Sequence, residues 1–309
     1  MSLIEQVLAD IKSDRKKKVI IDTDAYNEVD DQYSIAYSIA ASDKFDVLSI
    51  NAAPFKWNGN SYNYEDGMER SYEEIIRVLE AAGLTDIPVY MGSNFEMTDN
   101  GGAPVYSPAA RNIIDAALAS DEIIYIFGLG AITNVASALL MRPDIKDKIA
   151  LIWLAGTIFD GINVDEYNLK QDYRAGQVVF DSGMPLILCP AWDVTKVLEC
   201  KMPEMAELQG NRIGDYLFGI VDRLAREMER LGNKYEDYGR IIWDIAAPAV
   251  LAVPHCAEYR IAKAPFLCEN VITGDRQYGF SEQRHELILM TKLNRDVVFE
   301  DAWKRIKSL

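Results

Sequence analysis

Short apolar runs alternate with longer segments of helical periodicity over the first two thirds of the chain. The apolar runs lie at 19–21, 47–50, 87–91, 123–127, 149–155 and 185–189. The segments with helical spacing of apolar residues lie at 30–42, 67–83, 107–120 and 132–143. Almost continuously apolar strands that alternate with amphipathic helices are typical of a parallel sheet covered by helices on both faces.

The last third of the chain has a different pattern. Residues 205–252 read as mostly helical, residues 258–291 as strands and turns, and residues 298–309 as a final helix. No linker rich in Pro, Gly or Ser and no repeat divides the chain. We therefore predict a single α/β domain over 18–309 around a mostly parallel central sheet, preceded over 1–17 by an amphipathic helix and a basic lead-in. Residues 1–3 could be a cloning remnant.

The net charge of the chain disfavours some classes of binding partner. With 48 acidic and 32 basic side chains, the formal net charge is −16, which disfavours nucleic acid and anionic membrane surfaces. No run of 18 apolar residues predicts a membrane span, and the N-terminus lacks the order of a secretory signal. The four cysteines have no C-x-x-C spacing. We therefore expect a cytoplasmic protein with reduced thiols.

A cluster of carboxylates follows the first predicted strand. Asp22, Asp24, Asp30 and Asp31 stand within ten positions, and Glu28 lies among them. Two carboxylates about 4 Å apart repel by roughly 4 kcal/mol at an effective dielectric near 20, whereas a helix N-terminus returns at most about 1 kcal/mol. A divalent cation would offset the repulsion, and oxygen ligands select Ca²⁺ or Mg²⁺. The competing interpretation is that these residues cap a helix and face solvent.

Four motifs in order resemble one enzyme family. DTDAYNEVDD at 22–31 resembles the N-terminal signature of the calcium-dependent inosine-uridine preferring nucleoside hydrolases. GLGAITNVASAL at 128–139, DEYNLKQD at 165–172 and IIWDIAAPAVLAVP at 241–254 are similar to three later segments of that family. The resemblance implies a nucleoside hydrolase fold, hydrolysis of an N-ribosidic bond, and assembly as a homodimer or homotetramer.

The resemblance also assigns residues. It implies a Ca²⁺ site formed by Asp24, Asp31, the backbone carbonyl of Leu129, and Asp244. Asp24 would also be the general base that takes a proton from the attacking water. Asp30 would hold a ribose hydroxyl, and Glu166 and Asn168 would contact the sugar near its 5′-hydroxyl.

Two loops depart from the family pattern. Five residues, AYNEV, separate Asp-x-Asp from Asp-Asp where the family usually has three. The longer loop could bring Tyr26, Asn27 or Glu28 into the pocket, and we predict Asn27 as a substrate contact. INAAPFKWNGN at 50–60 replaces the usual Gly-Asn. Its Phe55 and Trp57 could line the base site or be ordinary core or surface aromatics.

A third departure concerns the leaving group. The pyrimidine-tolerant branch of the family has His before the late Asp ligand, where this chain has Trp243. Trp in that position resembles the purine-preferring branch, in which the ring stacks on the base, although a core role for Trp243 is the alternative. The two histidines, His255 and His285, match no family motif and are expected to be structural.

The preferred hypothesis is therefore Ca²⁺-dependent hydrolysis of purine ribonucleosides to free base and ribose. One alternative keeps the fold and metal but cleaves another riboside or sugar glycoside. Another is a non-catalytic protein that binds calcium and sugar. A phosphotransfer enzyme with an Asp-x-Asp nucleophile is a fourth hypothesis, but the segments at 128–139 and 165–172 fit it poorly.

Overall fold

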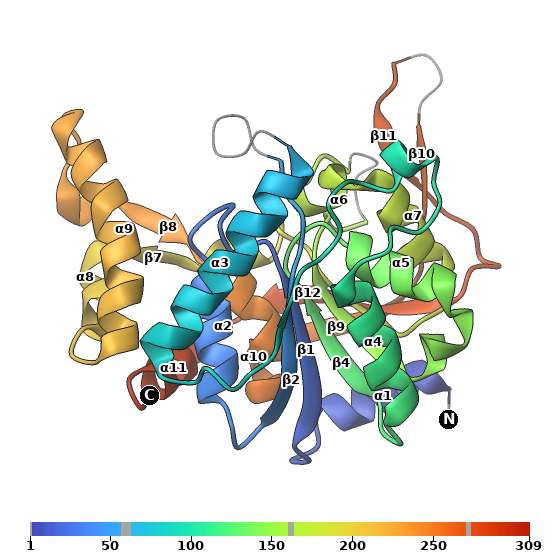
Figure 1. Cartoon of the computed structure of the whole chain (residues 1–309), viewed down its shortest axis with the longest axis horizontal. Helices are drawn as coiled ribbons and strands as arrows, with labels where there is room; N and C mark the ends of the chain where they lie inside the picture. Colours follow the sequence, from blue (N-terminus) through green and yellow to red (C-terminus); the bar gives the residue numbers. More distant parts are fainter. Residues whose placement is uncertain (1, 57–62, 160–163, 270–272) are drawn as a thin grey trace.

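The computed structural model describes residues 2–56, 63–159, 164–269 and 273–309. Within these residues the central feature is an 8-stranded sheet (Figure 1). In spatial order its strands are β3 (Val89–Tyr90), β2 (Phe45–Ala52), β1 (Lys17–Thr23), β4 (Ile124–Gly128), β5 (Ile149–Leu154), β6 (Leu186–Cys189), β12 (Glu286–Leu293) and β9 (Ala257–Lys263). Neighbouring strands are parallel except β9, which pairs antiparallel with β12 at the edge.

Helices cover both faces of the sheet. Alternate residues of each strand point to opposite faces, so Val19 and Ile21 of β1 belong to one apolar cluster and Ile20 belongs to the other. The first cluster includes residues of α1 (Leu3–Ile11), α2 (Asp31–Ala40), α3 (Tyr64–Ala82), α9 (Arg212–Arg230), α10 (Ala246–Ala252) and α11 (Arg295–Ile306). The second includes residues of α4 (Pro108–Ala119), α5 (Thr133–Met141) and α7 (Tyr173–Asp181).

The prediction of a single α/β domain with a mostly parallel sheet is confirmed. All six predicted apolar runs are strands of the central sheet, and the four predicted helices between them are α2 to α5. Gly83, predicted to end the third helix, has a φ of 71°, a left-handed conformation that glycine adopts without steric cost.

The segment before Asp244 differs from the prediction. Instead of a helix from residue 241, the structure has a short strand, β8 (Gly239–Ile241), paired with β7 (Glu199–Lys201). A 3₁₀ turn at Trp243–Ile245 follows, and α10 begins only at Ala246. Backbone pairing with a segment about 40 residues earlier outweighs the local helical pattern. Together with α8 (Met202–Met205) and α9, this strand pair projects from one side of the sheet (Figure 1).

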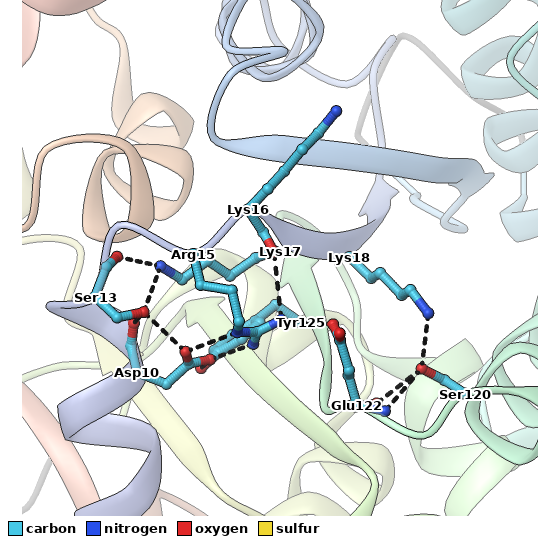
Figure 2. Close-up of polar contacts among 9 residues, drawn as sticks. All are labelled: Asp10, Ser13, Arg15, Lys16, Lys17, Lys18, Ser120, Glu122 and Tyr125. Atoms are coloured by element: carbon cyan, nitrogen blue, oxygen red, sulfur yellow. Dashed lines mark hydrogen bonds and ion pairs between the residues drawn. The ribbon is translucent and has the colours of Figure 1, made fainter.

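The basic lead-in is fixed at the amino end of β1, as Figure 2 shows. The Asp10 carboxylate accepts hydrogen bonds from Arg15 at 2.5 Å and from the Tyr125 hydroxyl at 2.8 Å. Lys17 Nζ donates to the backbone carbonyl of Ser13 at 2.5 Å, whereas the Lys16 side chain points away from the cluster (Figure 2). These contacts join the α1 end to β1 and β4, at the sheet edge opposite the carboxylates that follow β1.

The remaining described elements are short. They include α6 (Tyr167–Gln171) and the hairpin of β10 (Phe266–Glu269) with β11 (Arg276–Gly279). Among the described residues, no helix combines the length and the apolar character that crossing a membrane requires.

Candidate active site

A cavity of about 600 Å³ opens at the carboxyl end of the central strands. Such crevices are where parallel α/β sheets bind ligands, because loops from several strands meet there. All nine residues predicted from the sequence as site residues line it: Asp24, Asn27, Asp30, Asp31, Leu129, Glu166, Asn168, Trp243 and Asp244. The fold therefore brings together side chains from four segments that are distant in sequence.

Three carboxylates that line this cavity form an acidic cluster. Oxygen atoms of Asp30, Asp31 and Asp244 all lie within 4.8 Å of one another, and each residue is at most 5% exposed. Asp30 and Asp31 stand at the N-terminus of α2, and Asp244 lies in the 3₁₀ turn before α10. The Ser34 hydroxyl of α2 donates to the backbone carbonyl of Asp244 at 3.0 Å, which ties the two elements together.

The geometry of Asp30 argues against a simple capping role. Asp30 occupies the N-cap position of α2, but its side chain makes no cap hydrogen bond. Burial, followed by the charge of Asp31, raises the pKa of Asp30 to about 8. The Thr23 hydroxyl donates to the Asp31 carboxylate. Burial and the charge of Asp24 nevertheless hold the pKa of Asp31 well above its usual range.

The acidic cluster has the composition of a site for a hard divalent cation. Among the described residues that line the cavity, the basic side chains are Lys170 and Arg240. Lys170 pairs with Asp165 at 3.0 Å and Arg240 pairs with Glu28, so neither neutralises the cluster. Burial and the charges of neighbouring aspartates also raise the pKa of Asp244. Buried carboxylates without a protein cation fit a bound metal ion held by oxygen ligands.

Asp24 is held beside the cluster by two amides. The side-chain amides of Asn27 and Gln171 both donate to its Oδ2 atom, each at 3.1 Å. Burial, together with the charge of Asp30 as a smaller cause, raises the pKa of Asp24 to about 8. Gly130 packs so closely that a Cβ there would lie 2.8 Å from Asp24 Cγ. The carboxylate is thus fixed in one orientation.

Asp22, the first aspartate of the motif, has a separate environment. It does not line the cavity, and it accepts a hydrogen bond from the Asn134 amide at 3.4 Å. Its second oxygen has no hydrogen-bond partner in the described part of the chain. Burial raises the pKa of Asp22 to about 7. The same Asn134 amide donates to the Ala52 carbonyl at 3.2 Å, so this pair links β1, β2 and α5 behind the site.

The predicted sugar contacts lie on the side of α6. Glu166 caps this helix, accepting backbone N–H bonds from Asn168 and Leu169 at 3.0 Å and from Gly156 at 2.8 Å. The Asn168 amide donates to the Leu129 carbonyl at 3.2 Å and to the Leu154 carbonyl at 2.9 Å. Both residues are therefore rigidly placed, and the carbonyl predicted as a metal ligand is oriented by one of them.

Two tryptophans also line the cavity. The rings of Trp192 and Trp243 meet edge to face, with centroids 5.2 Å apart and planes at 72°. Trp192 is 55% exposed, and Trp243 is half-buried. We call these two residues the tryptophan wall. Beside it, Arg240 of β8 forms an ion pair with Glu28 of the loop after β1.

The longer loop after β1 sends two of its three candidate residues into the cavity. Asn27 and Glu28 line the cavity, whereas Tyr26 is 37% exposed and lies under the Arg70 guanidinium, 5.7 Å from its ring centroid. The Gln32 amide donates to the Ala25 carbonyl at 2.6 Å and holds the start of the loop against α2.

The sequence also offered two aromatic candidates for the base site, Phe55 and Trp57. Phe55 is fully buried and does not line the cavity, so the structure supports the core interpretation of this residue over the base-site one. It packs against Gly67 of α3, a contact that the sequence pattern did not reveal. Trp57 lies outside the described residues. His255 and His285 do not line the cavity either.

The sequence analysis missed two residues that line the cavity, Trp192 and Arg240, and one that holds Asp24, Gln171. Trp192 lies just beyond the carboxyl end of β6, and that position was a usable signal. Gln171 stands within the recognised segment 165–172, but its bond to Asp24 depends on the tertiary structure. No sequence pattern pointed to Arg240, because the three-residue strand that carries it is defined only by its pairing with β7.

Comparisons with known proteins agree with this geometry. A model of the family described as inosine-uridine preferring nucleoside hydrolase matches residues 19–300. Pyrimidine-specific ribonucleoside hydrolase RihB of Escherichia coli (strain SE11) is 26% identical over 250 residues, 72% of this chain and 74% of that protein. Uncharacterized protein C1683.06c of Schizosaccharomyces pombe is 29% identical over 226 residues, covering 64% and 68% of the two chains.

Solved structures share the fold. The plant nucleoside hydrolase PpNRh1 superposes with a TM-score of 0.74 at 18% identity, over 96% of this chain and all of that one (100%). An inosine-guanosine nucleoside hydrolase gives a TM-score of 0.73 at 19% identity, over 94% and 99%. The resemblance drawn from the four motifs is thus confirmed. The chain belongs to the inosine-uridine preferring nucleoside hydrolase family as a divergent member, and it is a hydrolase that acts on N-glycosyl bonds of nucleosides.

Proposed function

We propose that this protein is a Ca²⁺-dependent hydrolase that prefers purine ribonucleosides and releases free base and ribose. The observation that carries the proposal is a cavity lined by both the acidic cluster and the tryptophan wall. Carboxylates suit a sugar that becomes positively charged, and indole rings suit a flat purine base.

We call the acidic cluster, together with Asp24 and the Leu129 carbonyl, the acidic end of the cavity. The acidic end would bind the metal and the ribose. Asp31, Asp244 and the Leu129 carbonyl are the proposed Ca²⁺ ligands together with Asp24, and Asp30, which lines the same cavity, would accept a bond from a ribose hydroxyl. When bound, Ca²⁺ would supply positive charge that orients the ribose hydroxyls and the attacking water. Glu166 and Asn168 would position the sugar from the α6 side.

Asp24 is the proposed general base. Asn27 and Gln171 both engage its Oδ2 atom, which leaves Oδ1 as the oxygen to take a proton from water. As the glycosidic bond lengthens, positive charge on the sugar ring is stabilised by the surrounding carboxylates. Trp243 would stack on the departing base.

The proposed preference for purines rests on the tryptophan wall and not on the names of similar proteins. The RihB relative is named for pyrimidine specificity, but this chain places Trp243 before Asp244 and adds Trp192 beside it. A purine offers a larger face to these rings than a pyrimidine does. We also propose a homodimer or homotetramer, which light scattering on the purified protein would test.

The test is chromatography of a nucleoside panel. Purified protein is incubated with inosine, guanosine, adenosine, uridine and cytidine, with Ca²⁺ or with EDTA. Release of purine bases that chelation abolishes would support the proposal. Release of uracil and cytosine alone would overturn the purine preference, and activity unaffected by EDTA would overturn the metal requirement.

A further inference from the structure

The cavity contains a cation that the proposed reaction has not used. Arg240 lines the cavity together with Trp243 and the acidic cluster. Its Nη2 atom pairs with Glu28, while its Nε atom is buried without a hydrogen-bond partner in the described part of the chain. A guanidinium has five N–H donors, and one carboxylate engages only some of them. Leaving such a donor buried and unpaired is costly unless a ligand completes it.

The position of Arg240 is fixed from two sides. Strand β8 holds it through backbone pairing of Arg240 with Cys200, and Glu28 holds its side chain. Glu28 is two residues from Asp30, so the guanidinium is tethered to the same loop that carries the predicted ribose contact. Trp243 follows three residues after Arg240. The guanidinium therefore belongs to the same cavity lining as the predicted ribose contact Asp30 and the tryptophan wall, within which the base of a nucleoside would be bound.

We infer that Arg240 recognises the leaving base and makes 6-oxopurine ribosides, such as inosine and guanosine, the favoured substrates. The inference rests on the proposed function. A guanidinium donates two parallel hydrogen bonds to the O6 and N7 atoms of a 6-oxopurine. Adenine has an amino donor in place of O6, and a pyrimidine lacks the paired acceptors.

The same contact supplies leaving-group stabilisation in a chain without the family histidine. As the bond between C1′ and N9 breaks, its electron pair stays on the purine and spreads onto O6 and N7. Water gives hydroxide to C1′ and its proton to Asp24, and the purine anion then takes a proton from solvent. Hydrogen bonds from the Arg240 cation to O6 and N7 stabilise that anion in the transition state.

The experiment compares Arg240→Met and Arg240→Lys with the wild-type protein on inosine, adenosine and p-nitrophenyl riboside. The p-nitrophenolate is a good leaving group that needs no stabilisation by the protein. The rate of p-nitrophenyl riboside hydrolysis therefore reports only on metal and ribose binding at the acidic end. We expect kcat/KM for inosine to fall roughly 10- to 100-fold in Arg240→Met. Adenosine should change less than about 3-fold, and p-nitrophenyl riboside should be unchanged. Arg240→Lys keeps the positive charge but loses the two parallel N–H donors of the guanidinium. Its rate on inosine should therefore lie between those of Arg240→Met and the wild-type protein.

Controls separate this inference from the proposed function. Arg111→Met removes an arginine of α4 that pairs only at the surface, with Asp115, and should leave all three rates unchanged. Equal losses on all three substrates in Arg240→Met would show a structural role and overturn the inference, as would an unchanged rate on inosine. A wild-type protein that cleaves p-nitrophenyl riboside but neither purine nucleoside would overturn the purine proposal and this inference while leaving the acidic end intact.

Discussion

The acidic end of the cavity and the tryptophan wall are built in different ways. The acidic end is formed by residues that directly follow strands or begin helices of the central fold, and these residues are almost fully buried. The tryptophan wall is formed by the loop after β6 and the turn after β8, and Trp192 is 55% exposed. In the function proposed above, metal and ribose binding is thus assigned to rigid parts of the sheet, whereas choice of the base is assigned to peripheral segments that can change without disturbing it.

The largest expected effect comes from the acidic end. Asp31→Asn keeps the shape of the side chain and its contact with Thr23, but removes a charge from the proposed Ca²⁺ site. We expect at least about 1,000-fold loss of kcat/KM on every substrate, with loss of calcium binding by titration calorimetry. Circular dichroism should show an intact fold. Full turnover in this variant would show that the acidic end has been assigned incorrectly.

Metal and pH should act together on stability. Burial raises the pKa of Asp24 and of Asp30 to about 8, above the unfolded value near 4. The stability that such a carboxyl contributes is complete below about pH 4 and is lost as the pH rises through about 8, by up to roughly 1.4 kcal/mol per pH unit for each proton released.

Bound Ca²⁺ should oppose this loss, because it stabilises the ionised carboxylates. The increase in Tm that Ca²⁺ causes over EDTA should therefore be larger at pH 8 than at pH 5, as measured by differential scanning fluorimetry. Asp31→Asn should remove most of the difference. A metal effect on Tm that is the same at both pH values would contradict the burial of ionisable groups at this site.

The wall should show smaller and substrate-dependent effects. Stacking of one base on an aromatic side chain contributes about 1–3 kcal/mol, so Trp243→Ala should lower kcat/KM for inosine by roughly 5- to 100-fold. Hydrolysis of p-nitrophenyl riboside should fall less. Trp192→Ala is the matched variant at the exposed edge of the pair and should cost less on inosine than Trp243→Ala. The opposite order would place the base outside the half-buried part of the wall.

Gln171 should give the smallest effect, because it shares its task with Asn27. Gln171→Leu removes one of two amide bonds to Asp24 Oδ2, and we expect kcat to fall roughly 3- to 10-fold with KM unchanged. Steady-state kinetics on inosine would measure both constants. A change in KM alone would mean that Gln171 contacts the substrate instead of positioning Asp24.

The sequence predicted the acidic end better than the wall, for a physical reason. Asp24, Asp30 and Asp31 surround one strand–helix junction, and Asp244 was found because its helix matches a family segment. Arg240 reaches the cavity from β8, a strand of three residues whose pairing with β7 outweighs the local helical pattern, whereas Trp192 stands in the loop after β6. The two interpretations of Phe55 could not be separated from the sequence, because its burial against α3 depends on packing that a motif does not encode.

The most direct test is a crystal structure of the Asp24→Asn variant with Ca²⁺ and inosine. The account predicts a cation bonded to Asp31 and Asp244, the ribose hydroxyls at the acidic end, and the hypoxanthine against Trp243 with O6 and N7 facing Arg240. A nucleoside bound in the reverse orientation, or a cation bound away from the acidic cluster, would contradict the division of the cavity into an acidic end and a base-recognising wall.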